Sequence, residues 1–127
     1  MAGEPIRPPS FPAPRGHYSP GFRAGGWLFV SGQLPIVPGA APDAALSFEQ
    51  QTRLVLANVR TVVEAAGGSL ADVARVTVYL ADIGLWGEFN AIYAEIFGSH
   101  RPARAVVPVP KLHYELKLEV EAAAWLG

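Results

Sequence analysis

Only two segments of this chain carry the apolar period of an amphipathic helix, and the other patterned segments alternate as strands do. Two helices can cover only one face of a five- or six-stranded sheet. We therefore predict an α+β fold of two layers, in the order β-β-α-β-α-β-β, with a mixed sheet covered on one face by two helices. The other face of the sheet must meet water or another subunit.

The first helix is the more clearly marked of the two. Ser47 and Gln50 have the spacing of a capping box, in which the serine accepts from the backbone and the glutamine reaches back. Gly67 follows the last apolar position, and glycine is the preferred residue at the left-handed position that follows a helix. The expected buried stripe consists of Phe48, Val55, Val59, Val62, Val63 and Ala66.

The second helix is expected to be capped by Asp82 and closed by Gly98. Its apolar stripe recurs at helical spacing. The members of that stripe are Leu85, Trp86, Phe89, Ile92, Tyr93, Ile96 and Phe97.

The strands are indicated by alternation and by turn residues. Gly25 and Gly26 separate two β-prone runs and predict a hairpin, because tight turns require positive φ. The expected strands are 22–24, 27–31, 75–80, 103–109 and 115–122. The last of these places Leu116, Leu118, Val120 and Ala122 on one face. Residues 1–15 contain five prolines and are predicted to form a loose or extended arm before a single domain at 16–127.

Composition excludes several kinds of chemistry. The chain has no cysteine, which removes disulfides, thiolate metal ligands and cysteine nucleophiles. The net charge is −1 with no basic track, so nucleic acid is not an expected partner. Neither a glycine-rich phosphate loop nor an HExxH motif is present, and the three histidines lie far apart, so we expect no cofactor and no metal. No run resembles a signal peptide or a membrane span, and a soluble cytoplasmic protein is expected.

Arg104 is the most informative single residue. It stands in a small, apolar, strand-like segment, where a guanidinium needs a partner. One interpretation is a structural ion pair, the commoner arrangement, with Glu119 or Glu121 of the last strand as partner. The other interpretation is a binding site for an anion. Residue pattern alone leaves both open.

Several segments resemble the motifs of the YjgF/RidA family, in the family's order and from about residue 16 to 124. Residues 16–21 (GHYSPG) and 28–35 (LFVSGQLP) resemble its GPYSQA and VFVSGQ(I/L)P motifs. Residues 89–93 (FNAIY), 101–104 (RPAR) and 118–122 (LEVEA) are similar to its VNxxY, PAR(S/T) and (I/V)E(I/V)EA motifs.

The resemblance implies a chorismate-mutase-like subunit assembled into a homotrimer, with a cleft between each pair of neighbours. It implies that Arg104 pairs with a ligand carboxylate and that Glu119 holds a water, while Glu121 is structural. Tyr18 would be the third catalytic residue. The residues that would border the substrate together with Arg104 are Gly32, Asn90 and Val106.

The implied reaction is the hydrolytic deamination of reactive 2-imino or enamino acids, such as 2-aminoacrylate, to 2-keto acids and ammonia, without a cofactor. Three other functions stay open: a non-catalytic trimeric binder of small carboxylate metabolites, an endoribonuclease or translation inhibitor, and a structural trimer. The presence of both Arg104 and Glu119 favours the enzyme, since a binder needs only the arginine. The near-neutral charge disfavours the ribonuclease.

The sequence departs from the family pattern around the expected cleft. His17 stands where the motif has proline, Val106 where cysteine is frequent, and residues 108–114 differ from the usual loop. These changes concern the pocket wall and hence the choice of substrate. His113 lies in that loop, either as a surface residue, the commoner case, or as a proton donor near the cleft.

Overall fold

The N-terminus of helix α1 (Phe48–Ala65) is formed by the capping box that the sequence predicts. The computed structural model describes residues 3–127. The backbone amide of Gln50 donates to the Ser47 hydroxyl at 3.0 Å, and the amide of Ser47 donates to the Gln50 side chain at 2.9 Å. Gly67, with φ +90°, follows the end of the helix. The predicted first helix is therefore confirmed, including both of its ends.

Helix α2 (Trp86–Phe97) begins slightly later than its predicted cap would place it. Asp82 accepts from the Gly84 amide and starts a short 3-10 turn, Ile83–Leu85, which leads directly into α2. The helix ends at Gly98, as predicted. One consequence is that Trp86 begins the helix and stays 41% exposed instead of joining the buried stripe.

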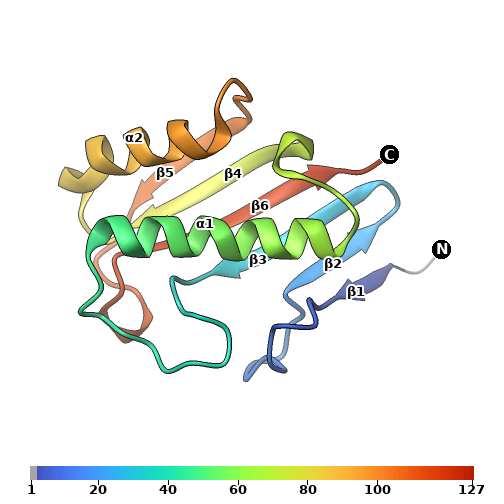
Figure 1. Ribbon diagram of the computed structural model, residues 1–127, viewed down its shortest axis with the longest axis horizontal. Helices are drawn as coiled ribbons and strands as arrows, with labels where there is room; N and C mark the ends of the chain where they lie inside the picture. The colour runs from blue at the N-terminus through green and yellow to red at the C-terminus, as the bar shows by residue number, and fades with distance from the viewer. Residues whose placement is uncertain (1–2) are drawn as a thin grey trace.

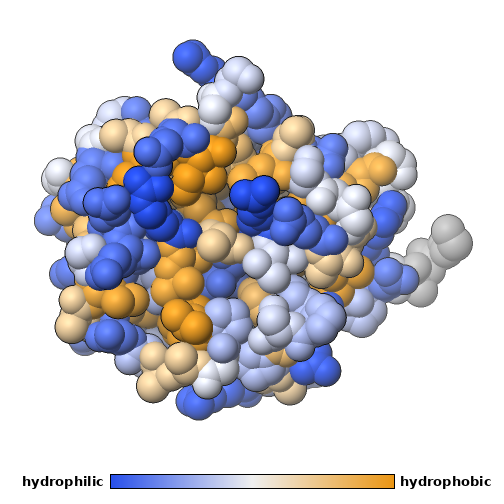
Figure 2. All heavy atoms as spheres, in the orientation of Figure 1, coloured by the Kyte–Doolittle hydropathy of each residue, from blue (hydrophilic) through white to orange (hydrophobic). Residues whose placement is uncertain are grey.

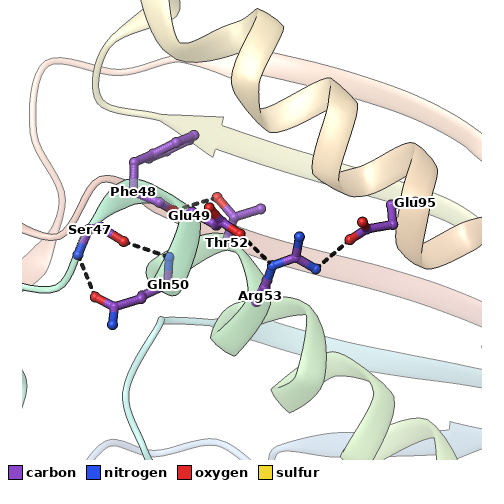
Figure 3. A network of polar contacts seen from close by, with 7 residues as sticks. All are labelled: Ser47, Phe48, Glu49, Gln50, Thr52, Arg53 and Glu95. Atoms are coloured by element: carbon purple, nitrogen blue, oxygen red, sulfur yellow. Dashed lines mark hydrogen bonds and ion pairs between the residues drawn. The ribbon is translucent and has the colours of Figure 1, made fainter.

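An exposed ion network links the two helices. Arg53 of α1 bonds to Glu49 one turn earlier and to Glu95 of α2, as Figure 3 shows beside the capping box. Exposed pairs of this kind contribute little to stability, so the helices are held chiefly by the apolar residues beneath them.

The sheet has six strands in the order β1-β2-β3-β6-β4-β5. They are β1 (Glu4–Ile6), β2 (Gly21–Ala24), β3 (Trp27–Gln33), β4 (Val73–Leu80), β5 (Ala103–Pro108) and β6 (Leu118–Trp125). Only β4 and β5 are parallel, so the sheet is mixed. Figure 1 shows α1 and α2 on the same side of it. The predicted two-layer α+β fold is confirmed.

The strands differ from the sequence interpretation in two main respects, besides shifts of one to three residues at other strand ends. Strand β1 was not predicted, because three residues with a proline show no alternation, yet it pairs with β2 at the edge of the sheet. The last strand begins at Leu118 and not at residue 115, because Tyr114 and Glu115 have φ of 60° and 58° and cannot continue a strand. The predicted inward face, from Leu116 to Ala122, is nevertheless buried.

The core lies between the helices and the inner face of the sheet. Val76, Val78 and Leu80 of β4 point inward, as predicted, and are at most 1% exposed. Strand β4 lies between β5 and β6 in the sheet, and these three residues belong to one buried apolar cluster with residues of α1 and α2. Seen from the helix side, the surface mixes hydrophilic and hydrophobic residues (Figure 2). Among residues 3–127, no helix is both long and apolar enough to cross a membrane.

The opposite face of the sheet is covered by neither α1 nor α2, and it is apolar where β2, β3 and the end of β6 lie. Phe29 of β3 is 50% exposed and lies beside Phe22 of β2, which is 45% exposed. At the same face Trp27 packs edge to face on Trp125 of β6, with ring centres 5.1 Å apart. Large exposed apolar patches on a folded domain commonly mark an interface.

Candidate active site

Strand β5 presents Arg104 to the helix side of the sheet. Arg104 is the register partner of Val76, whose side chain is buried beneath the helices. Its Nη1 donates to Oδ1 of Asn90 on α2 at 3.0 Å. The guanidinium carbon lies 4.8 Å from the ring centre of Tyr93 and 5.7 Å from the centres of Trp86 and Phe89. Residues on successive turns of α2 therefore surround the guanidinium of Arg104.

The ion pair between Arg104 and the last strand is not formed, and that interpretation is wrong. Within residues 3–127, no carboxylate lies within ion-pair distance of Arg104. Glu119 and Glu121 pair in register with Tyr79 and Thr77 of β4, on the face that the helices leave bare. The Tyr79 hydroxyl donates to Oε1 of Glu121 at 2.7 Å, which gives Glu121 a structural partner on that face.

A cavity of about 480 Å³ lies next to Arg104, between α2 and the start of β5. Asn90, Tyr93 and Arg104 are among its lining residues. The Tyr93 hydroxyl is buried and has no hydrogen-bond partner among the described residues. Burial raises the pKa of Tyr93 to about 12, although the charge of Arg104 opposes the shift, so the phenol stays protonated.

Gly32 and Glu119 form a second group of predicted site residues. A Cβ placed on Gly32 would overlap the carboxylate of Glu119, so glycine at this position lets the carboxylate approach the strand closely and a larger residue would displace it. Gly32 lies in the irregularity of β3 between Val30 and Gln33, where the pairing with β6 shifts register. Burial raises the pKa of the Glu119 carboxyl; His113 nearby lowers it, and the charge of Glu121 raises it further.

Tyr18 belongs to the same group as Gly32. Both line a cavity of about 370 Å³, and the Tyr18 side chain is 57% exposed. Ser31 holds the Tyr18 loop against β3: its hydroxyl donates to the Ser19 carbonyl at 2.6 Å and its amide to the Pro20 carbonyl at 2.9 Å. Ser31 therefore aligns the loop that carries Tyr18 with the strand that carries Gly32.

The chain by itself does not bring the two groups together. Strand β4 lies between β5 and β6, and Arg104 pairs with Val76 whereas Glu119 pairs with Tyr79, three residues further along β4. The backbones at Arg104 and Glu119 are therefore about 14 Å apart, given roughly 4.8 Å between neighbouring strands and roughly 3.3 Å per residue. Their side chains also leave opposite faces of the sheet. Arg104 and Asn90 form one group of predicted site residues, and Val106 lies on the same face of the sheet, packed against the core. Tyr18, Gly32 and Glu119 form the other.

Some contributing residues were missed or given a different role by the sequence interpretation. Trp86, Phe89 and Tyr93 were all assigned to the core stripe, but their rings also surround the guanidinium of Arg104. Their spacing of three and four residues on one helix is a signal that could have indicated this. Ser31 gave no comparable signal. His17 is exposed, and His113 is exposed yet near enough to influence Glu119.

These features define a class of protein: a two-layer α+β domain with one sheet face that the helices leave bare, and an arginine of the edge strand β5 supported by aromatic rings of α2. The sequence matches the family described as Endoribonuclease L-PSP over residues 9–126, and the chain belongs to this family, also called the YjgF/RidA family. The resemblance noted in the sequence is thereby confirmed.

The alignments with related proteins extend over nearly the whole chain. A RutC family protein of Pyrococcus horikoshii is 44% identical over 114 residues, 90% of each chain. The Escherichia coli (strain K12) protein provisionally named reactive intermediate deaminase TdcF is 36% identical over 116 residues, 89% of each chain. Among solved structures, Escherichia coli TdcF with bound serine has a TM-score of 0.88 at 34% identity, covering 98% of this chain and 99% of TdcF. Yeast Mmf1 has a TM-score of 0.92 at 32% identity, covering 99% and 100%.

Proposed function

We propose that this protein hydrolyses reactive 2-imino acids, and the enamines in equilibrium with them, to 2-keto acids and ammonia. The observation that carries the proposal is the state of Arg104. Its guanidinium lies over the Tyr93 ring beside a cavity and bonds to Asn90, a neutral side chain. A guanidinium has five N–H donors, so donors remain for a ligand.

A carboxylate is the ligand that such an arginine fits best. The planar guanidinium can donate two parallel hydrogen bonds to the two carboxylate oxygens, which fixes both the position and the plane of the ligand. The TdcF structure with bound serine supports this, since serine carries a carboxylate. The aromatic rings around Arg104 hold the guanidinium in place before the ligand arrives.

The reaction then needs little more than a positioned water. Glu119, with its raised pKa, accepts a proton from the water as the water oxygen bonds to the imine carbon. The product of this addition is a carbinolamine, which carries one hydroxyl and one amino group on the same carbon. Glu119 delivers this first proton to the nitrogen to complete the carbinolamine. The hydroxyl proton then moves to the same nitrogen, so that the carbon–nitrogen bond breaks, the carbonyl forms, and ammonia and the 2-keto acid are released. Positioning supplies most of the acceleration, because the substrate is already reactive.

The proposed active site is composite and lies between subunits of a homotrimer. Two observations support this. Within one chain, the side chains of Arg104 and Glu119 point away from opposite faces of the sheet. If both residues touch the same substrate, the Arg104 of one subunit must therefore act together with the Glu119 of another. The apolar face around Phe29 also offers a surface that a neighbour could cover. Closed cyclic assemblies repeat the same site at each interface.

Subunit mixing tests the composite site. The variants Arg104→Ala and Glu119→Gln should each be inactive alone. Co-expressed at equal levels with random assembly, they should regain about a quarter of the parent activity, because about a quarter of the clefts combine an intact Arg104 with an intact Glu119. Mixed assemblies that stay inactive, although both variants fold and exchange subunits, would show that one chain supplies the whole site.

The reaction itself is tested by generating 2-iminopropionate in the assay and following its decay with and without the protein. We expect faster decay with equal release of ammonia and pyruvate. The family description names an endoribonuclease, so RNA is incubated with the same preparation. If small carboxylates bind but imine decay is not faster, the protein is a non-catalytic binder. If the protein cleaves RNA and Arg104→Ala abolishes the cleavage, the ribonuclease is favoured.

A further inference from the structure

We propose that the cavity beneath the N-terminal arm is a subsite for a large apolar substrate side chain, and that the preferred substrates are 2-imino acids with leucine-like or phenylalanine-like side chains. This inference rests on the proposed function and specifies its substrate class. Tyr114 is the residue to which we assign the selection.

The cavity is mostly apolar and far larger than a small substrate needs. Its volume is about 370 Å³, whereas a water or a methyl group takes up roughly 30 Å³. The arm supplies Phe11, Pro12 and Pro14 to its wall, and the loop after β3 supplies Leu34, Ile36 and Val37. Pockets lined by apolar groups, with only a few polar ones, typically bind apolar parts of small molecules.

The cavity adjoins the reacting half of the site. Gly32 lines it, and the Glu119 carboxylate lies directly against Gly32. Tyr18 lines it as well. When the imine carbon of a substrate faces the water held by Glu119, the side chain attached to that carbon can therefore reach into this cavity.

The wall is held in shape by buried hydrogen bonds. Asn58 of α1 is 6% exposed and donates both amide hydrogens, to the Leu34 carbonyl at 3.0 Å and to the Ile36 carbonyl at 2.9 Å. Asn58 thus ties the loop that carries Leu34 and Ile36 to the helix. A preformed apolar wall binds a side chain without a further ordering cost.

Tyr114 is placed at the cavity by an unusual backbone. It has φ 60° and ψ 24°, and Glu115 follows with φ 58°, a conformation that residues other than glycine rarely adopt. The Lys111–Glu115 ion pair at 2.8 Å closes this loop, and the His113 ring lies 5.9 Å from the Tyr114 ring. Strained residues cluster at ligand sites, and here the strained residue contributes an aromatic ring to the cavity.

The test compares imines that differ only in the side chain. 2-Imino acids are generated in the assay from alanine, leucine and phenylalanine, and kcat/KM is measured for each. We expect the parent protein to prefer the phenylalanine-derived imine over the alanine-derived one by at least about tenfold, as filling an apolar pocket does. Tyr114→Ala should lower this ratio by about tenfold, whereas Tyr114→Phe should preserve it, because the ring supplies the contact.

Two further variants complete the experiment. Ala13→Phe adds bulk to the cavity from the arm and should also lower the ratio. Ile83→Ala removes an exposed apolar side chain outside both cavities and should leave all three rates unchanged. A parent ratio near one, or a ratio that neither Tyr114→Ala nor Ala13→Phe changes, overturns the subsite while leaving the deaminase intact. Failure to accelerate any of the three imines removes the proposed function and the subsite together.

Discussion

The guanidinium of Arg104 lies over the ring face of Tyr93, with its central carbon 4.8 Å from the ring centre. Tyr93 is 6% exposed, and its own hydroxyl has no partner among the described residues. The arginine is therefore supported by π-electron density and by the Asn90 amide, neither of which neutralises its charge. An arginine held in this way is prepared for an anionic ligand.

Removal of Arg104 should abolish activity without unfolding the protein. We expect Arg104→Ala to lower kcat/KM for imines by at least about 100-fold, and Arg104→Lys to lower it sharply, because lysine keeps the charge but loses the planar donors. The loss of stability should stay below about 2 kcal/mol, since no buried carboxylate is left unpaired. Imine decay and thermal melting on one preparation measure both effects.

A suitable control for the lost charge is Arg60→Ala, which removes an exposed arginine of α1 whose ion-pair partner within residues 3–127 is Glu64. It should match the parent in both measurements. A strongly destabilised Arg104→Ala protein, or one with full activity, would remove Arg104 from the site.

Gly32→Ala should disturb the carboxylate of Glu119. The added Cβ would overlap that carboxylate, so the side chain must move or β3 must shift. We expect kcat/KM to fall by at least about tenfold, since displacing a catalytic group by a fraction of an ångström is costly. The matched control is Gly87→Ala in α2, where an added Cβ meets nothing within 4 Å. That variant should keep full activity and be up to about 1 kcal/mol more stable. Equal activity of the two variants would contradict the assigned position of Glu119.

The raised pKa of Glu119 predicts a specific pH dependence of stability. A carboxyl whose pKa is higher in the folded than in the unfolded state binds more protons when folded between the two values. The free energy of unfolding therefore decreases as pH rises from about the ordinary value of 4.5 to the raised pKa, and the penalty persists above it. Glu119→Gln should remove this part of the decrease and raise the melting temperature at neutral pH.

The same variant should lower activity by about 100-fold, the usual contribution of a general base. Melting curves of parent and variant across the acidic range provide the comparison. If Glu119→Gln is less stable than the parent at neutral pH, the carboxylate has a favourable partner and the assignment of its environment is wrong.

The bare face of the sheet should be the assembly surface. Phe29→Asp places a charge in the middle of that face, and we expect it to yield monomers by light scattering and to lose activity although Arg104 and Glu119 are intact. Ile83→Asp is the matched control, because Ile83 is 52% exposed and Phe29 is 50% exposed. It should remain trimeric and active. A parent protein that is a stable monomer at micromolar concentration would contradict both the trimer and the composite site.

Local chemistry determined much of this fold from sequence. The Ser47–Gln50 capping box, the hairpin at Gly25 and the alternation of Val76, Val78 and Leu80 each depend on residues close together in the chain, and each appears as predicted. The order of these elements was sufficient to predict two helices on one face of a mixed sheet. The family motifs were also readable, because each lies within a few consecutive residues.

Tertiary structure alone decided which of the distant residues meet. The sequence placed Arg104 and Glu119 as potential partners, but the strand order inserts β4 between them and the register turns them to opposite faces. It also placed Trp86 and Tyr93 in a core stripe, whereas the parallel pairing of β5 beside β4 brings Arg104 over their rings. Strand pairing and register are set by the packing of the whole core, and no short window of sequence contains that information.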